Sequence, residues 1–125
     1  PGHTDLSFMS MIPPATDPGL QILTRTGEWI DQPAIPDAIL VNTGDTLRHW
    51  SNDTYIATPH RVLPSKKVDR YSNILFFYPN VDAKMTCLPT CTSDANPPKY
   101  PPITFGEFHA AYAARNFSYA ETKAS

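Results

Sequence analysis

Residues 1–12 read P-G-H-T-D-L-S-F-M-S-M-I, and the interpretation of the whole chain starts from this stretch. It places an imidazole at His3 and a carboxylate at Asp5, directly before an apolar run over residues 6–12 that predicts a β-strand. Side chains two positions apart in an extended segment point to the same side. We therefore expect His3 and Asp5 to face one site together.

Two later motifs extend this pattern. T-P-H-R-V at 58–62 supplies a second imidazole, His60, and R-Y-S at 70–72 supplies Arg70 and Ser72. Two imidazoles and one carboxylate, with other coordination positions left open, suit a mononuclear non-haem Fe(II) site that activates O₂. A planar guanidinium binds a carboxylate through two parallel hydrogen bonds, and a hydroxyl on the same strand face can assist it. The set predicts an oxygenase with a carboxylate-bearing co-substrate.

Each of these signals is weak when taken alone. H-x-D arises often by chance, and a single histidine usually belongs to the surface or the core, which is how we interpret His49 and His109. Arg70 has an alternative role as the partner of Asp69 or Glu28 in an ion pair. The joint pattern is far more specific, because the arginine and the serine also follow the second histidine at a suitable offset.

The composition narrows the class of protein. The 125 residues are 41% hydrophobic and 18% charged, which suits one globular domain with a modest core. The net charge of −2 does not indicate a basic surface for binding nucleic acid. Apolar runs such as residues 74–78 are too short to cross a membrane. Cys87 and Cys91 are too isolated for a structural zinc site. We expect two reduced thiols in a cytoplasmic protein, with a local disulfide as the alternative.

Turn signals divide the chain into short elements. Strands are expected at residues 6–12, 20–25, 28–30, 38–42, 55–57, 60–63 and 70–78, with a short helical turn at 47–50. The run over 70–78 is apolar on both faces beyond Ser72, which predicts a central strand. Thr104 and Glu107 form a capping box, so we expect a helix over residues 104–116 and a frayed tail after Tyr119.

Together these motifs resemble the 2-oxoglutarate and Fe(II)-dependent dioxygenases of the isopenicillin N synthase-like branch. The resembling stretches are residues 1–12, G-L-Q-I-L at 19–23, G-E-W-I at 27–30, A-I-L-V-N-T-G-D-T-L at 38–47, W-S-N-D-T-Y at 50–55, T-P-H-R-V at 58–62, R-Y-S-N-I-L-F-F-Y-P-N at 70–80, and Y-P-P-I-T-F-G-E-F at 100–108. They occur in the family's order and cover about residues 1–117.

The resemblance implies a mainly β fold, a double-stranded β-helix or jelly roll with a C-terminal α-helix. Residues 1–103 would form the C-terminal part of the jelly roll, and residues 104–125 the helix and tail. Family members carry a longer N-terminal part. We therefore expect that a preceding segment or a second chain completes this fold, since unpaired sheet edges would otherwise be exposed.

The resemblance also implies an activity. His3, Asp5 and His60 would bind Fe(II) and form the catalytic centre, and Arg70 and Ser72 would bind the distal carboxylate of 2-oxoglutarate. With O₂, such an enzyme hydroxylates, desaturates or cyclises a small molecule and releases succinate and CO₂, often in secondary metabolism.

The substrate is predicted only loosely. Phe8, Met9 and Met11, together with Phe108 and Tyr112 on the last helix, would suit an apolar or aromatic molecule if they are not plain core residues. Two alternatives stay open. One is a related Fe(II) oxidase that uses no 2-oxoglutarate. The other is a jelly-roll fragment without catalysis that acts only by pairing with another chain.

Overall fold

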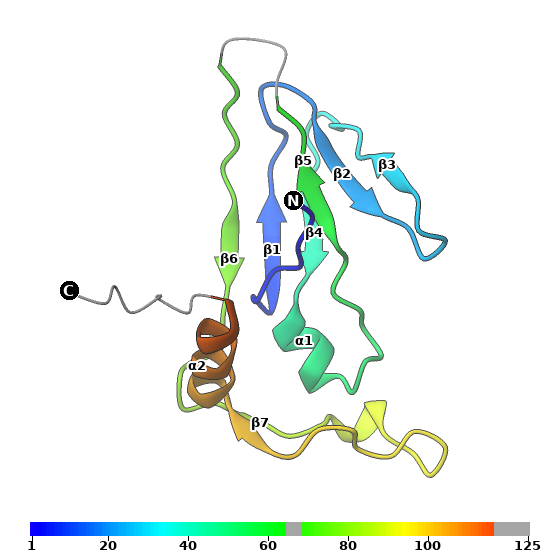
Figure 1. Ribbon diagram of the computed structural model, residues 1–125, viewed down its shortest axis with the longest axis vertical. Coiled ribbons are helices and arrows are strands. Elements are labelled where there is room, and N and C mark those ends of the chain that lie inside the picture. The colour runs from blue at the N-terminus through cyan, green and yellow to red at the C-terminus, as the bar shows by residue number, and fades with distance from the viewer. Residues whose placement is uncertain (65–68, 117–125) are drawn as a thin grey trace, which may run out of the picture.

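The computed structural model describes residues 1–64 and 69–116, so the predicted fraying after Tyr119 lies outside the described residues. The chain is mainly β with a C-terminal helix, as predicted (Figure 1). The strands are β1 (Met9–Ile12), β2 (Leu20–Leu23), β3 (Trp29–Asp31), β4 (Leu40–Thr43), β5 (His60–Val62), β6 (Leu75–Phe77), β7 (Lys84–Met85) and β8 (Ile103–Thr104). The helices are α1 (Asp45–Trp50), the short 3₁₀ turn η1 (Pro89–Cys91) and α2 (Phe105–Asn116).

Two antiparallel three-stranded sheets form the body of the structure, in the orders β4-β1-β6 and β3-β2-β5. The predicted turn at residues 26–27 joins β2 to β3, and Gly27 adopts φ 87°, a conformation that favours glycine. The ladder β7-β8 and both helices lie at one end of the two sheets (Figure 1). The predicted capping box forms at the N-terminus of α2: the Thr104 amide donates to Glu107 Oε2, and the Glu107 amide donates to Thr104 Oγ1.

The register of β1 separates the two faces of its sheet. Ser10 pairs with Asn42 on one side and Phe76 on the other, so these three side chains share a face. Ile12 and Leu40 also pair with each other and belong to this face. Since Ile12, Leu40 and Phe76 line a cavity, this is the inner face of the sheet.

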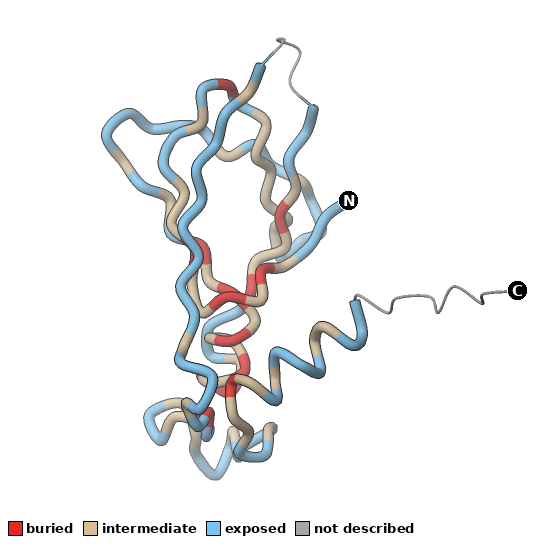
Figure 2. Tube along the Cα trace, turned by 90° about the vertical axis from the view of Figure 1, so that its left-hand side faces the viewer, coloured by how far each residue is buried: buried red, intermediate tan, exposed pale blue. Residues whose placement is uncertain are grey.

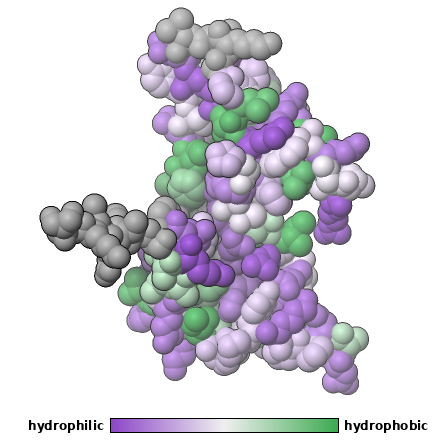
Figure 3. Space-filling view, in the orientation of Figure 1, coloured by the Kyte–Doolittle hydropathy of each residue, from purple (hydrophilic) through white to green (hydrophobic). Residues whose placement is uncertain are grey.

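The outer face of the same sheet is apolar and open. Met11 pairs with Val41 and Leu75 on this side, and the latter two are 52% and 58% exposed. Figure 3 shows apolar side chains along the edge of the molecule where β6 runs.

The strand predicted over residues 70–78 is wrong in extent and position. Only Leu75–Phe77 is paired, and β6 stands at the edge of the sheet that the described residues form, with β1 at the centre. The pairing stops because β1 runs into Pro13 and Pro14, which have no amide hydrogen to donate. The extended chain before β6 is tied down differently, through bonds between Thr16 and Tyr71.

Two further strand predictions need correction. Residues 55–57 form no strand: Asn52 and Asp53 adopt positive φ angles, and the Tyr55 amide donates to Ser51 Oγ in a local turn. β1 begins at Met9 rather than at residue 6, because the carbonyls of Asp5, Leu6 and Phe8 accept hydrogen bonds from amides of the β4–α1 junction.

Buried residues gather at the helical end of the molecule (Figure 2). The buried apolar residues among those described are Ala57, Met85, Cys87 and Phe105. The buried polar residues are Asp5, Ser7, Ser10, Asp17, Asn42, Thr46, His49, Ser51, Asn52 and His60. Because polar groups are costly to bury without partners, these side chains are expected to take part in hydrogen bonds.

Candidate metal centre and co-substrate cavity

His3 and His60 are joined directly through their backbones. The His3 amide donates to the His60 carbonyl at 3.0 Å, and the His60 amide returns a bond of 2.9 Å. A directly paired antiparallel bridge places both side chains on one face, and the two rings lie 4.5 Å apart. The start of the chain and β5 are thereby locked together at the two imidazoles.

Asp5 completes the cluster. Its Oδ1 lies 3.7 Å from His3 Nε2 and 3.5 Å from His60 Nε2. One ligand atom from each of the three residues lies within 4.8 Å of the other two, which is close enough for a single ion to join them. The structure therefore brings together the three residues predicted to be metal ligands; His3 is exposed, whereas Asp5 and His60 are buried.

The support of His60 is a backbone carbonyl. Its Nδ1 lies 3.1 Å from the Thr58 oxygen, a contact that assigns the hydrogen to Nδ1 and turns Nε2 toward Asp5. The contact with Asp5 raises the pKa of His60, although burial opposes the shift. Burial would raise the pKa of Asp5, but bonds with His60, Ser10 and Asn42 outweigh it and lower that pKa to about 2. Asp5 is therefore a carboxylate at any physiological pH.

The segment that carries Asp5 is held by the β4–α1 junction. The Asp45 amide donates to the Asp5 carbonyl at 2.7 Å, and the Thr46 hydroxyl and amide both donate to the Leu6 carbonyl. Thr4 Oγ1 donates to Asp45 Oδ2 at 2.7 Å. The first amides of a helix have no partner within it, so these bonds satisfy both segments at once.

Gly44 makes this close approach possible. A Cβ added at Gly44 would lie 2.8 Å from the Asp5 carbonyl oxygen and closer still to that of Ser7. Its backbone is extended, at φ −110° and ψ 179°, so the requirement for glycine here is one of space. The motif N-T-G-D-T at residues 42–46 thus holds the segment that carries Asp5 in place. The sequence alone indicates only a turn at this motif.

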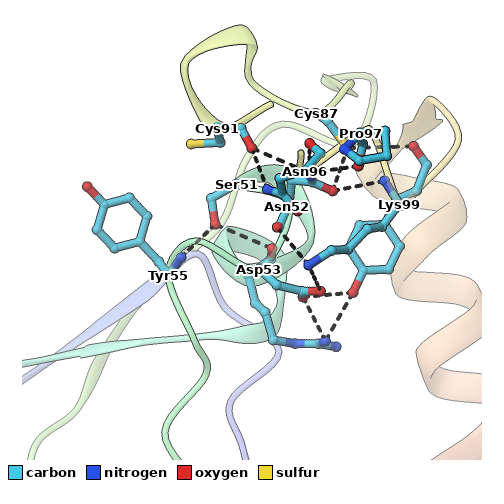
Figure 4. A network of polar contacts seen from close by, with 11 residues as sticks. Ser51, Asn52, Asp53, Tyr55, Cys87, Cys91, Asn96, Pro97 and Lys99 are labelled. Atoms are coloured by element: carbon cyan, nitrogen blue, oxygen red, sulfur yellow. Dashed lines mark hydrogen bonds and ion pairs between the residues drawn. The ribbon is translucent and has the colours of Figure 1, made fainter. Parts of the chain in front are cut away.

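A buried polar network fixes α1 from its other end (Figure 4). The Asn52 amide group, fully buried, donates to the carbonyls of Cys91, Asn96 and Pro97, and its oxygen accepts from the Lys99 amide. Asn52 adopts φ 53°, a left-handed conformation that asparagine tolerates well. The long loop after β7 is thereby fastened to the end of α1.

The histidines and cysteines outside the cluster have other surroundings. His49 is buried between the rings of Tyr100 and Phe108, and His109 packs against Phe105, so neither joins the three ligands. Cys87 and Cys91 are both free thiols, as expected.

Arg70 and Ser72 line the same cavity as the three ligand residues. The cavity has a volume of about 120 Å³, and its walls between the two groups are apolar, with Ile74 and Phe76 among them. Arg70 is oriented by a 3.0 Å bond from Nε to the Asp17 carbonyl. Ser72 stands four residues before Phe76, or about 13 Å along an extended chain. The cavity therefore has a metal end and a cationic end.

A second hollow of about 360 Å³ opens on the other side of the cluster. It is lined by His3, Thr4, Asp5, Leu6, Phe76, Tyr78, His109, Tyr112 and Ala113. Of the residues predicted to face a substrate, Tyr112 lies here, whereas Phe8, Met9, Met11 and Phe108 do not. The two hollows share His3, Asp5 and Phe76, so both meet at the candidate metal centre.

Sequence reasoning missed the supports of the site. Ser10 and Asn42 both donate to Asp5 Oδ2, and Thr58 positions His60. A signal was present, since Ser10 and Asn42 are polar residues inside otherwise apolar strands. However, only the register of β1 and β4 shows that these two side chains face the cavity side of the sheet.

No helix in residues 1–64 or 69–116 has the length and apolarity needed to cross a bilayer. Among known families, the model of the 2OG-Fe(II) oxygenase superfamily matches residues 1–79, which is more than half of the chain.

Curated relatives agree with this match. The chain is 41% identical over 114 residues to the kihadalactone A synthase LFS of Citrus sinensis, covering 86% of this chain and 33% of that protein. It is 36% identical over 108 residues to the flavonol synthase/flavanone 3-hydroxylase of Arabidopsis thaliana, covering 86% of this chain and 32% of that protein. The chain spans about a third of the length of the curated relatives it matches.

A solved structure shows the same fold. A full-length protein of Neurospora crassa, crystallised in complex with alpha-KG and thymine, superposes with a TM-score of 0.84 at 30% identity, over 94% of this chain and 37% of that one. The mainly β architecture is thus part of a double-stranded β-helix. The family uses Fe(II) and 2-oxoglutarate, and the cluster of His3, Asp5 and His60 is a possible metal site. From its motifs, its fold and its relatives, the chain belongs to the 2OG-Fe(II) oxygenase superfamily, with homologues in the isopenicillin N synthase-like branch.

Proposed function

We propose that this chain forms the catalytic core of an Fe(II)- and 2-oxoglutarate-dependent dioxygenase that oxidises a small molecule. One observation carries the proposal: His3, Asp5 and His60 open onto the same cavity as Arg70 and Ser72. A metal-binding cluster and a carboxylate-binding pair at two ends of one cavity suit a co-substrate that needs both.

The donors fit Fe(II) by their chemistry. Two imidazole nitrogens and one carboxylate oxygen converge, and the pKa of Asp5 keeps that carboxylate charged. His60 carries its hydrogen on Nδ1 and so offers Nε2 to a metal. When bound, the iron would supply the oxidative chemistry that converts 2-oxoglutarate and O₂ to CO₂ and succinate and oxidises a C–H bond of the substrate.

The remaining residues would bind and orient the two organic molecules. Arg70 is already fixed through Nε, and its guanidinium would pair with the distal carboxylate of 2-oxoglutarate, assisted by the Ser72 hydroxyl. The hollow beneath α2 would hold the oxidised molecule. Its walls, with Phe76, Tyr78 and Tyr112 among them, suit an apolar or aromatic compound.

The exposed outer face of the β4-β1-β6 sheet is relevant to whether the chain folds stably when it is expressed by itself. Val41, Leu75 and Phe77 are 52%, 58% and 39% exposed there, and soluble proteins rarely leave such contiguous apolar faces uncovered. We expect the 125-residue chain expressed by itself to lack a cooperative thermal melt. A cooperative melt with iron-dependent succinate release would contradict this expectation and would also exclude a fragment without catalysis.

The test of the function is metal-dependent turnover. The full chain, in the protein that carries it, is assayed for succinate release with Fe(II), O₂ and 2-oxoglutarate, alone and with a panel of aromatic compounds. His60→Ala should reduce bound iron and turnover by more than about 100-fold, because loss of an outer-shell partner already costs roughly 10- to 100-fold. His109→Ala is the matched control and should retain iron.

Near-normal iron content in His60→Ala would overturn the metal assignment. Oxidation of a substrate without succinate release would favour the related oxidase, in which Arg70 and Ser72 hold a carboxylate of the substrate or of an activator.

A further inference from the structure

Ser10 and Asn42 make contact with one oxygen of Asp5 and leave the other to the imidazoles. Ser10 Oγ donates to Asp5 Oδ2 at 2.7 Å, and Asn42 Nδ2 donates to the same oxygen at 3.0 Å. Oδ1 faces His3 and His60. The two oxygens of this carboxylate therefore have separate partners, one set from the neighbouring strands and the other from the cluster.

We propose that Ser10 and Asn42 are positioning residues that present Asp5 to the metal through Oδ1 alone. This inference rests on the proposed function, since it assigns a role to residues around the same metal. A carboxylate can bind a cation through one or both of its oxygens. With Oδ2 held by two donors, Asp5 would offer only Oδ1 to a metal.

The location of the pair suits this role. Ser10 and Asn42 are directly opposite each other in β1 and β4, and they are 0% and 9% exposed. Burial keeps water from competing for Oδ2 and strengthens hydrogen bonds to a charged group. The donors thus act on the carboxylate in a region where they are not replaced by solvent.

The hydrogen-bonding roles within the pair are consistent. Ser10 has a single hydroxyl hydrogen, which it donates to Asp5, and its oxygen lies 3.4 Å from Asn42 Nδ2. The Asn42 amide must direct nitrogen rather than oxygen toward Asp5, because two acceptors would repel each other. Both side chains are therefore committed to the carboxylate and cannot be exchanged for apolar residues without freeing Oδ2.

A purely structural role makes a different prediction. If the two residues only filled the space between β1 and β4, their loss would lower stability and leave the metal site unchanged. If they set the orientation of Asp5, their loss would alter the coordination of a bound metal. The visible absorption of Co(II) reports coordination number and geometry independently of catalysis, so it separates these two roles.

The experiment compares Ser10→Ala and Asn42→Leu with two controls. Ser10→Thr keeps the hydroxyl donor. Thr43→Val removes a hydroxyl in the same strand β4, one that donates to the Ile56 carbonyl. The protein that carries the full chain is compared in its apo and Co(II)-loaded forms by Co(II) absorption, Co(II) affinity and thermal melting. We expect Ser10→Ala and Asn42→Leu to weaken Co(II) binding about 10- to 100-fold and to change its spectrum.

Both controls should keep the spectrum and affinity of the unchanged chain. An unchanged spectrum and affinity in Ser10→Ala and Asn42→Leu would overturn the inference and leave the proposed function standing. If the unchanged chain bound Co(II) no better than His60→Ala, the metal site and the inference would both fall. Should Asn42→Leu fail to fold, Ser10→Ala, which removes one oxygen atom, decides the result alone.

Discussion

The two ends of the cavity are built in different ways. At the metal end, Asp5 and His60 are 8% and 7% exposed, and each is held by side chains or by backbone bonds; His3 is exposed but is joined to His60 by two backbone hydrogen bonds. At the cationic end, Arg70 is half-buried, Ser72 is exposed, and neither lies in a paired strand. A metal needs ligand atoms placed to a fraction of an ångström, whereas a long guanidinium can adjust to reach its carboxylate.

The difference has a backbone cause. The metal end lies where β1 pairs with β4 and β5 pairs with β2, and where the β4–α1 junction binds the carbonyls of Asp5, Leu6 and Phe8. At the cationic end, Pro13 and Pro14 interrupt the ladder beside the extended chain before β6. Substitutions at the two ends should therefore change different properties of the protein. Those at the cationic end should change co-substrate affinity, and those at the metal end should change metal affinity and stability together.

Among the substitutions that compare the two ends, Arg70→Lys should have the largest effect. Lysine keeps the charge but loses the planar fork, and breaking a buried charged pair costs roughly 2 to 5 kcal/mol. The apparent affinity for 2-oxoglutarate, measured by isothermal titration in the presence of Fe(II), should fall at least about 10-fold, while metal affinity stays the same. If 2-oxoglutarate binding were unchanged and substrate binding dropped, the oxidase interpretation would replace the proposed one.

Gly44→Ala should have the next largest effect, at the metal end. The added methyl group would meet backbone oxygens of Asp5 and Ser7, which cannot move away as a flexible side chain would. Overpacking of this kind costs about 1–3 kcal/mol. Chemical denaturation should show this loss, and Co(II) affinity should fall with it because Asp5 is displaced.

Gly27→Asn is the control for that experiment. A Cβ at Gly27 meets nothing within 4 Å, and its positive φ strains asparagine less than most residues, so this variant should lose some stability and keep its Co(II) affinity. Equal losses of Co(II) affinity in both variants would mean that the β4–α1 junction has no special link to the ligand segment.

The sequence was informative wherever residue type carries the chemistry. Histidine and carboxylate at His3, Asp5 and His60 could be identified without any structure, because few other roles explain that set in that order. The capping box at Thr104 and Glu107 was equally direct, since its two bonds are local. The assignment of His3, Asp5, His60, Arg70 and Ser72 to their roles stays a prediction until metal and co-substrate binding are measured.

What could not be predicted depends on pairing between distant segments. Ser10 and Asn42 act on Asp5 because β1 and β4 meet in one particular register, which no local pattern specifies. The position of β6 depends on pairing in the same way: its residues are apolar on both faces, which predicts a central strand, but Pro13 ends the partner strand and β6 lies at the edge of the described sheet. Gly44 likewise resembled an ordinary turn residue.

A smaller effect is expected for Ser72→Ala at the cationic end. A single hydrogen bond from a neutral hydroxyl contributes about 0.5–1.5 kcal/mol, so 2-oxoglutarate affinity should fall roughly 2- to 10-fold. Titration at fixed Fe(II) measures the change, with stability unaltered because Ser72 is exposed. A loss as large as that of Arg70→Lys would show that the hydroxyl, and not the guanidinium, dominates the cationic end.

The smallest effect should be a loss of stability in acid that originates at His49. Burial, followed by the nearby charge of Arg48, lowers the pKa of His49 below its ordinary value of 6.5, so the unfolded chain takes up this proton more readily than the folded one. The groups around it that titrate or carry charge are Asp45, Arg48, Asp53, Tyr100, Tyr112 and Arg115. The stability that neutral His49 contributes is therefore complete above about pH 6.5 and declines as the pH falls below that value.

His49→Phe separates this contribution from those of other titrating groups. Phenylalanine keeps a ring between Tyr100 and Phe108 and removes Nε2, which is buried without a hydrogen-bond partner. Melting temperatures of the protein that carries the chain and of its His49→Phe variant, measured from about pH 8 to about pH 5, should diverge only in the acid range, where the unchanged protein loses more. The difference between them cancels the titration of Asp5 and His60, which both proteins share. A difference in melting temperature that stays constant with pH would show that His49 contributes to stability through packing alone and not through its protonation state.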